Sequence, residues 1–166
     1  MDGPSVAPHI PRLRRYARAL VGDRYRADDL VQDTLERALN KFHLWRPGSD
    51  LRAWLFAIMH NVFINQLRSR GIETTSEFEE QFAGVAAPPV TDRLELRDLE
   101  SALSRLPPEQ RAVLLLVALE DMSYAEVADT LGVPIGTVMS RLARGRERLR
   151  GLMAGEPSPT GLRVVK

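Results

Sequence analysis

Five polar side chains near the end of the chain recur at helical spacing, and their chemistry suits nucleic acid: Thr137, Ser140, Arg141, Arg144 and Arg148. Residues three and four positions apart share one side of a helix. An arginine guanidinium offers a fork of donors to guanine O6 and N7, and hydroxyls bond phosphates or base edges. The spacing predicts a helix that enters a DNA major groove, with the solvated face of an ordinary helical hairpin as the alternative.

The preceding segment supplies the turn that such a helix needs. Ser123 and Glu126 have the S-x-x-E spacing of a capping box, and Gly132 follows where the chain must turn sharply. The apolar positions that would hold two crossed helices together are Val127, Ala128, Leu131, Val133, Val138 and Leu142. A capping box, a turn glycine and a one-sided basic face together favour a DNA-binding helix-turn-helix.

Three further helices are predicted in the first half, over residues 10–21, 25–42 and 51–70. We expect Asp28 and Asp29 to open the second of them. Its buried stripe is predicted to be Val31, Leu35, Ala38, Leu39 and Phe42, and that of the third is predicted to be Leu51, Trp54, Leu55, Ile58, Val62 and Leu67. Residues 43–50 contain Pro47-Gly48 and read as a loop. Residues 8–71 therefore form a predicted three-helix bundle.

Periodicity disappears from Gly71 to Thr91, where the sequence gains Gly, Pro, Thr and Glu, and residues 72–91 read as a flexible linker. A second domain is predicted over residues 92–153. It opens at Asp92, breaks at Pro107-Pro108, and contains a buried helix around residues 113–119. Residues 154–166 read as a tail. The predicted fold is all-α, with two small helical domains, a three-helix bundle and a four-helix unit carrying the helix-turn-helix.

Charge is unevenly distributed along the chain. Residues 12–70 hold 12 basic and 6 acidic side chains (+6), residues 71–126 hold 4 and 12 (−8), and residues 127–153 hold 5 and 2 (+3). Two basic modules around an acidic middle suit a protein that binds DNA at two places.

Other function classes find little support in the sequence. There is no cysteine, and the three histidines are scattered without metal-ligand spacing, so we expect no metal, no cofactor and no enzyme activity. No apolar run is long enough to cross a bilayer, and residues 1–11 lack the pattern of a secretion signal. We expect a cytoplasmic protein without membrane insertion.

Four segments in order resemble regions 2 and 4 of bacterial RNA polymerase sigma factors of the extracytoplasmic-function (ECF) group: DDLVQDTLERAL, RPGSDLRAWLF, LPPEQRAVLLL and SYAEVADTLGVPIGTVMSRLARGRERL. The resemblance covers nearly everything except the ends and the linker. It implies a dissociable subunit that gives core RNA polymerase promoter recognition and begins strand separation. Residues 8–71 would be region 2, and residues 92–153 would be region 4.

The resemblance also implies roles for individual residues. An acidic surface would dock on the coiled coil of the polymerase β′ subunit: Asp28, Asp29, Gln32, Asp33 and Glu36. Contacts to the −10 element would come from Trp45, Arg46, Ser49, Arg52, His60, Asn61, Asn65, Arg68 and Arg70. Trp45 either lines a pocket for a flipped base or packs on the domain core.

The −35 element would be read by Thr137, Met139, Ser140, Arg141, Arg144 and Arg148. Met139 departs from the family pattern, in which many members carry Lys or Arg, and this suggests a shifted sequence preference. Arg146 and Arg150 point sideways and are expected to be solvated.

The implied partners are core RNA polymerase through its β′ coiled coil and β flap, promoter DNA, and an anti-sigma factor. Two alternatives from other classes remain: a dimeric helix-turn-helix regulator that acts without polymerase, and an adaptor that does not read DNA. A sigma factor differs from both because it acquires promoter specificity mainly after joining core polymerase.

Overall fold

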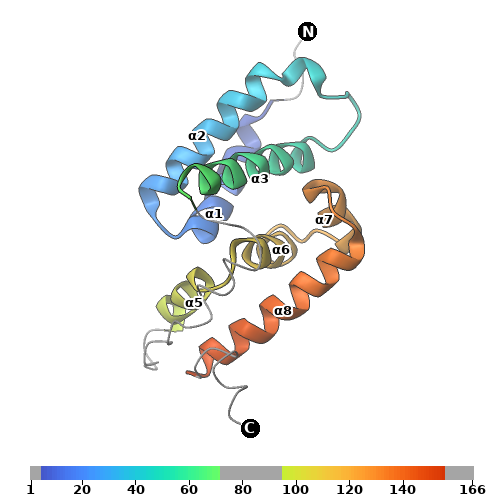
Figure 1. The fold of residues 1–166 in the computed structure, drawn as a ribbon. Coiled ribbons are helices and arrows are strands. Elements are labelled where there is room, and N and C mark those ends of the chain that lie inside the picture. The colour runs from blue at the N-terminus through green and yellow to red at the C-terminus, as the bar shows by residue number, and fades with distance from the viewer. Residues whose placement is uncertain (1–4, 72–94, 156–166) are drawn as a thin grey trace.

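The computed structural model describes residues 5–71 and 95–155, and these two parts are almost wholly helical (Figure 1). The first part contains η1 (Ala7–His9), α1 (Ile10–Val21), α2 (Arg24–Asn40), η2 (Phe42–Leu44) and α3 (Leu51–Ser69). The second part contains α5 (Glu95–Ser104), α6 (Pro108–Ala118), α7 (Tyr124–Leu131) and α8 (Ile135–Met153). The all-α prediction is confirmed. The predicted linker, Asp92 and most of the predicted tail lie outside the described residues.

Local signals place the ends of the first three helices. Gly22 adopts a left-handed conformation, with φ of 77°, and ends α1 where the sequence predicted. The side chain of Asp23 accepts a 3.0 Å hydrogen bond from the Tyr25 backbone N–H and caps α2. The prediction that Asp28 and Asp29 open this helix was therefore wrong: α2 begins at Arg24, next to the predicted start at residue 25, and Asp23 caps it. Asp50 caps α3 through a 3.2 Å bond from the Ala53 N–H.

The core of the first unit lies between α1, α2 and α3. Tyr16 of α1 meets Phe56 of α3 edge-to-face, with ring centroids 5.1 Å apart. One predicted core residue was wrong: Leu39 is 63% exposed. The buried stripe of α2 instead runs through Ala27, Leu30, Val31, Thr34 and Ala38, and Leu39 lies one residue, or about 100° of helical rotation, beyond it.

Helix α6 is the centre of the second unit. Pro108 occupies its first turn, as the Pro107-Pro108 pair predicted, and most of its side chains are buried, including Gln110 and Arg111. The Arg111 guanidinium donates to backbone carbonyls of Leu20, near the end of α1, and of Ser104 and Leu106, at and just beyond the end of α5. It therefore satisfies carbonyls that have no partner within their own helices.

The helix-turn-helix forms as predicted from α7 and α8. The Glu126 N–H donates to Ser123 Oγ at 3.1 Å, and the Ser123 N–H donates to Glu126 Oε1 at 2.8 Å, which completes the capping box. Gly132 takes φ of 70° at the turn. Val127, Val138 and Leu142 are buried between the helices.

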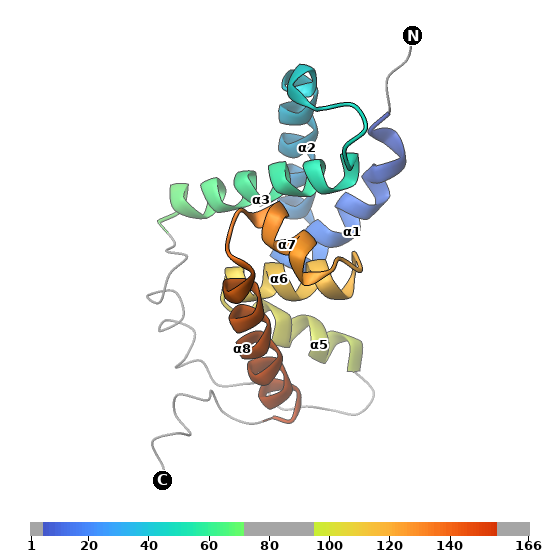
Figure 2. The same cartoon turned by 90° about the vertical axis from the view of Figure 1, so that its right-hand side faces the viewer.

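The two units pack against each other, which the sequence did not indicate. Helix α1 contacts α5 and α6, and α3 contacts α7 (Figure 2). The Tyr16 hydroxyl donates a 3.4 Å hydrogen bond to the carbonyl of Ala112 in α6, and burial raises the pKa of Tyr16 above its ordinary value. Buried side chains from both units form one continuous core.

Candidate nucleic-acid interface

The exposed face of α8 begins at the turn and runs along the N-terminal half of the helix. Ser140 and Arg144 are exposed, as predicted. Their exposed neighbours are Ile135, Gly136, Met139 and Ala143. This face lies opposite the buried residues Val138, Leu142 and Gly145, as a period of 3.6 residues requires. We call the six exposed residues the HTH face: Ile135, Gly136, Met139, Ser140, Ala143 and Arg144. This face presents one guanidinium, one hydroxyl and apolar groups.

Three predicted members of the basic face lie at its edge instead. Thr137, Arg141 and Arg148 are half-buried, so the prediction of five residues on one open face was wrong. Arg141 Nη2 lies 3.7 Å from the Oε1 atom of Glu109, at the start of α6. These three positions are rotated about 60–100° from the centre of the buried stripe, so they lie at the boundary between the buried side of α8 and its open face.

The acidic surface of α2 is largely open. Asp28, Gln32 and Glu36 are exposed and follow one another at intervals of four residues, and Asp29 is exposed beside them. Asp33 is half-buried, and its Oδ2 atom accepts a 3.0 Å hydrogen bond from Gln66 Nε2 of α3. Four of the five predicted docking residues therefore share a free face, whereas Asp33 also joins α2 to α3.

The predicted −10 residues divide between an open surface and a buried position. Asn61, Asn65 and Arg68 are exposed along one side of α3, and Arg46, Ser49 and Arg70 are exposed in adjoining segments. Ser49 Oγ donates to the Arg46 carbonyl at 2.6 Å and shapes the loop. Trp45 is only 8% exposed and stacks on Phe42, with ring centroids 5.5 Å apart. Of the two interpretations of Trp45, the structure supports packing on the core.

Arg52 and His60 lie between the two units. Arg52 Nη1 donates a 2.6 Å hydrogen bond to the carbonyl of Glu120 and lies 3.5 Å from its Oε1 atom. The Glu120 side chain is fully buried, and Arg12 Nε and Arg15 Nη2 each lie 3.5 Å from one of its carboxylate oxygens. Burial, reinforced by the charge of Arg141, lowers the pKa of His60 to about 4.

Sequence reasoning missed Glu120. Its signal is an acidic pair, Glu120-Asp121, directly after an apolar helix, together with a first helix that carries several arginines. Such a pattern does not distinguish a solvated loop acid from a buried ion-pair centre. Only the packing of the two units brings Glu120 to Arg12, Arg15 and Arg52.

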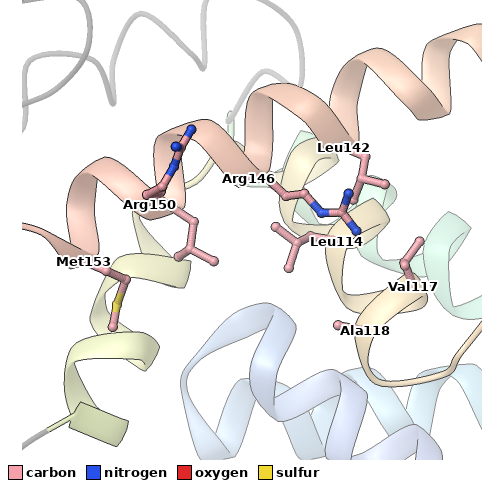
Figure 3. Close-up of a pocket in the computed structure, with 8 residues that line it drawn as sticks. Leu114, Val117, Ala118, Leu142, Arg146, Arg150 and Met153 are labelled. Carbon is pink, nitrogen blue, oxygen red and sulfur yellow. The ribbon is translucent and has the colours of Figure 1, made fainter.

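A hollow of about 360 Å³ lies between α6 and α8 (Figure 3). Its lining consists of Leu114, Val117, Ala118, Leu142, Arg146, Leu149, Arg150 and Met153. Arg146 extends from α8 toward the α6 side of the hollow, whereas Arg150 points away from it (Figure 3). Arg150 pairs with Glu147, so the prediction that both arginines are merely solvated was incomplete. The hollow combines an apolar lining with positive charge.

Within residues 5–71 and 95–155, no group of histidine and acidic side chains is arranged to hold a metal ion. In the same part of the chain, no helix has the length and apolar character needed to cross a membrane.

Two sequence families match the two units. Residues 6–60 match the family described as the Sigma2 domain of PhyR, and residues 96–149 match Sigma-70, region 4. The ECF RNA polymerase sigma factor EcfG of Rhodopseudomonas palustris is 40% identical over 146 residues, covering 87% of this chain and 80% of EcfG.

Solved structures agree with the sequence matches. The sigma factor RpoE of Bartonella quintana, in complex with the anti-sigma factor NepR, superposes with a TM-score of 0.71 at 35% identity, covering 97% of this chain and 96% of RpoE. The PhyRSL–NepR complex of Sphingomonas sp. Fr1 contains a chain that superposes with a TM-score of 0.63 at 26% identity, covering 93% of this chain and 90% of that one.

Proposed function

Because this chain belongs to the family of ECF RNA polymerase sigma factors, we propose that it binds core RNA polymerase, directs it to promoters through −10 and −35 elements and promotes promoter melting. The observation that carries the proposal is the HTH face on α8, where Arg144 and Ser140 stand exposed on a capped helix-turn-helix. An exposed arginine on such a helix suits guanine in a major groove. Residues 92–153 would then be the −35 module, residues 8–71 the −10 and core-binding module, and residues 72–91 their tether, with the protein acting in the cytoplasm.

Core binding is assigned to the acidic surface of α2. Asp28, Asp29, Gln32 and Glu36 present carboxylates and an amide that a basic coiled coil of the β′ subunit would complement. Exposed charges of this kind mainly set association rate and register. Asp33 supports the surface through its bond to Gln66.

Contact with the −10 element is assigned to the exposed side of α3 and to its preceding loop. Asn61, Asn65 and Arg68 offer amides and a guanidinium along one helix side, which suits a separated strand and its phosphates. Arg46 and Ser49 lie in the loop before α3. Arg52 and His60 belong to this set only when the two units separate, because both lie between them.

The hollow between α6 and α8 fits a protein partner of this region. Its apolar lining would bury a partner's apolar side chains, and Arg146 would pair with an acidic one. We assign it to the β flap of core polymerase and to a competing anti-sigma factor, the kind of partner that RpoE of B. quintana has in its complex with NepR.

In vitro transcription tests the proposal directly. The purified chain is combined with core RNA polymerase on a library of genomic promoters, and transcripts are mapped. We expect start sites that share two spaced elements, and their number should fall when Arg144 is replaced by Ala. Core polymerase that starts at the same sites with and without the chain would contradict the proposal.

A second candidate function rests on the match of residues 6–60 to the Sigma2 domain of PhyR. A solved PhyR is named an anti-anti-sigma factor in complex with NepR, so this chain would bind an anti-sigma factor as a decoy. A decoy needs no core polymerase and no promoter. Co-purification with core enzyme therefore separates the two functions, and its absence would favour the decoy.

A further inference from the structure

Two parallel rows of exposed residues run along the first half of α8. Ile135, Met139 and Ala143 form an apolar row at intervals of four residues, and Gly136, Ser140 and Arg144 form a polar row beside it. Met139 is 50% exposed and Ile135 is 46% exposed, and the two lie one helical turn apart, so they form an exposed apolar pair. Ile135 and Met139 are neighbours on the apolar row, and Ser140 lies between this row and Arg144 on the HTH face.

The chemistry of the apolar row differs from that of the polar row. Neither a thioether nor an alkyl chain donates a useful hydrogen bond to a phosphate or a base edge. The major groove, however, presents one apolar group, the C5-methyl of thymine, and apolar side chains contact it. Methionine has three rotatable bonds and a polarizable sulfur, so it adapts to an uneven surface.

We propose that Met139, supported by Ile135, contacts the C5-methyl group of a thymine in the −35 element. This inference rests on the proposed function, because it requires α8 to lie in the major groove. Met139 precedes Arg144 by five residues, or about 7.5 Å along the helix axis. The thymine is therefore a different base from the one that Arg144 reads. Met139 is thus a specificity-determining residue.

The test removes the methyl group and nothing else. Holoenzyme is assembled from the chain and core polymerase, and its affinity is measured for promoters in which each −35 thymine is replaced in turn by deoxyuridine. Base pairing is unchanged. We expect a loss of roughly threefold to fivefold at one thymine, the size expected for one buried methyl group. Met139→Ala should bind the thymine promoter with a similar loss and no longer distinguish it from the deoxyuridine promoter.

Two further variants separate this effect from a general weakening. Ser140→Ala should lower affinity for both promoters alike and keep the thymine preference. Met139→Lys should abolish the preference and make the salt dependence steeper by about one phosphate contact. Helicity measured by circular dichroism checks that each variant folds, and the exposure of Met139 makes its replacement compatible with folding.

Each outcome decides the inference. Equal affinity of the wild-type holoenzyme for thymine and deoxyuridine at every −35 position would overturn it, as would a preference that survives in Met139→Ala. If promoter binding persists and depends on Arg144, only the thymine contact fails. If the chain gives core polymerase no promoter preference, the proposed function fails with it.

Discussion

Arg52 Nη1 donates a 2.6 Å hydrogen bond to the carbonyl oxygen of Glu120 and lies 3.5 Å from the carboxylate of the same residue. A side chain assigned to the −10 element is thus held by the domain assigned to the −35 element. The Glu120 carboxylate is fully buried, and Arg12 and Arg15 approach it from α1. In this arrangement the packing of the two units occupies Arg52, and DNA contact by Arg52 requires the units to move apart.

Replacing the buried carboxylate tests how much this cluster stabilises the packed arrangement. We expect Glu120→Gln, which keeps the size and removes the charge, to lower the free energy of unfolding by roughly 1–3 kcal/mol. This expected loss of stability is smaller than the loss on breaking a fully buried ion pair, because Arg12 and Arg15 are half-exposed. Urea denaturation measures it. Glu147→Gln is the matched control, since its partner Arg150 is exposed and the change should stay within about 0.5 kcal/mol. Equal losses in both variants would show that the cluster adds nothing special.

The sequence predicted the ends of helices well where an end depends only on neighbouring residues. The Ser123–Glu126 capping box, Gly132 and Pro107-Pro108 act through their own backbone neighbourhood, and each lies where the sequence predicted. Asp23 was missed as the cap of α2 because Asp28 and Asp29 carry the same chemistry five and six residues later.

Contacts between distant segments did not follow from the sequence. Arg111 looks like one polar position on an apolar helix, yet it is buried against the carbonyls of Leu20 in α1 and of Ser104 at the end of α5. Its burial depends on how the two units meet, which no local pattern encodes. The same packing places Arg52 and His60 between the two units, so they are not part of the exposed −10 surface that the sequence predicted. By contrast, the exposed rows of α2 and α8 depend mainly on helical period. All four exposed members of the α2 row were predicted, but on the HTH face only Met139, Ser140 and Arg144 were.

His60 gives the stability of the packed chain a dependence on pH. Its pKa is lowered to about 4 in the folded chain, against about 6.5 for an unperturbed histidine. Between these values the unfolded chain binds a proton that the folded chain does not, so stability is full above pH 6.5 and falls as pH decreases toward 4. We expect the wild type to lose about 1–2 kcal/mol more than His60→Gln between pH 7 and pH 5.

Urea denaturation of both proteins at the two pH values measures this difference. Carboxylates contribute equally to both chains, so the comparison isolates His60. Parallel losses in the two proteins would mean that His60 takes up a proton in the folded chain as easily as in the unfolded chain.

The acidic surface of α2 yields a prediction about core polymerase. Charge reversal in Asp29→Lys should weaken core binding by about tenfold or less at low salt, with a smaller effect at high salt, because exposed charges are screened. Fluorescence anisotropy with labelled chain measures this affinity, and circular dichroism verifies helicity. Glu100→Lys on α5, another exposed acid, is the matched control. An unchanged affinity for Asp29→Lys would remove this face from the docking surface.

The geometry of α8 separates Arg144 from Thr137. Arg144 is exposed in the middle of α8, at the end of the HTH face, whereas Thr137 is half-buried in the first turn of α8. Arg144→Ala should cost ~1–3 kcal/mol at the matched −35 element and relax the preference at one base position, while Thr137→Ala should weaken all sequences alike. Holoenzyme binding to single-base variants at fixed salt distinguishes these patterns, since electrostatic affinity changes steeply with ionic strength. An unchanged base-preference profile in Arg144→Ala would mean that other residues of α8 read the −35 bases. Arg141 would then be the next residue to test, after its release from the ion pair with Glu109.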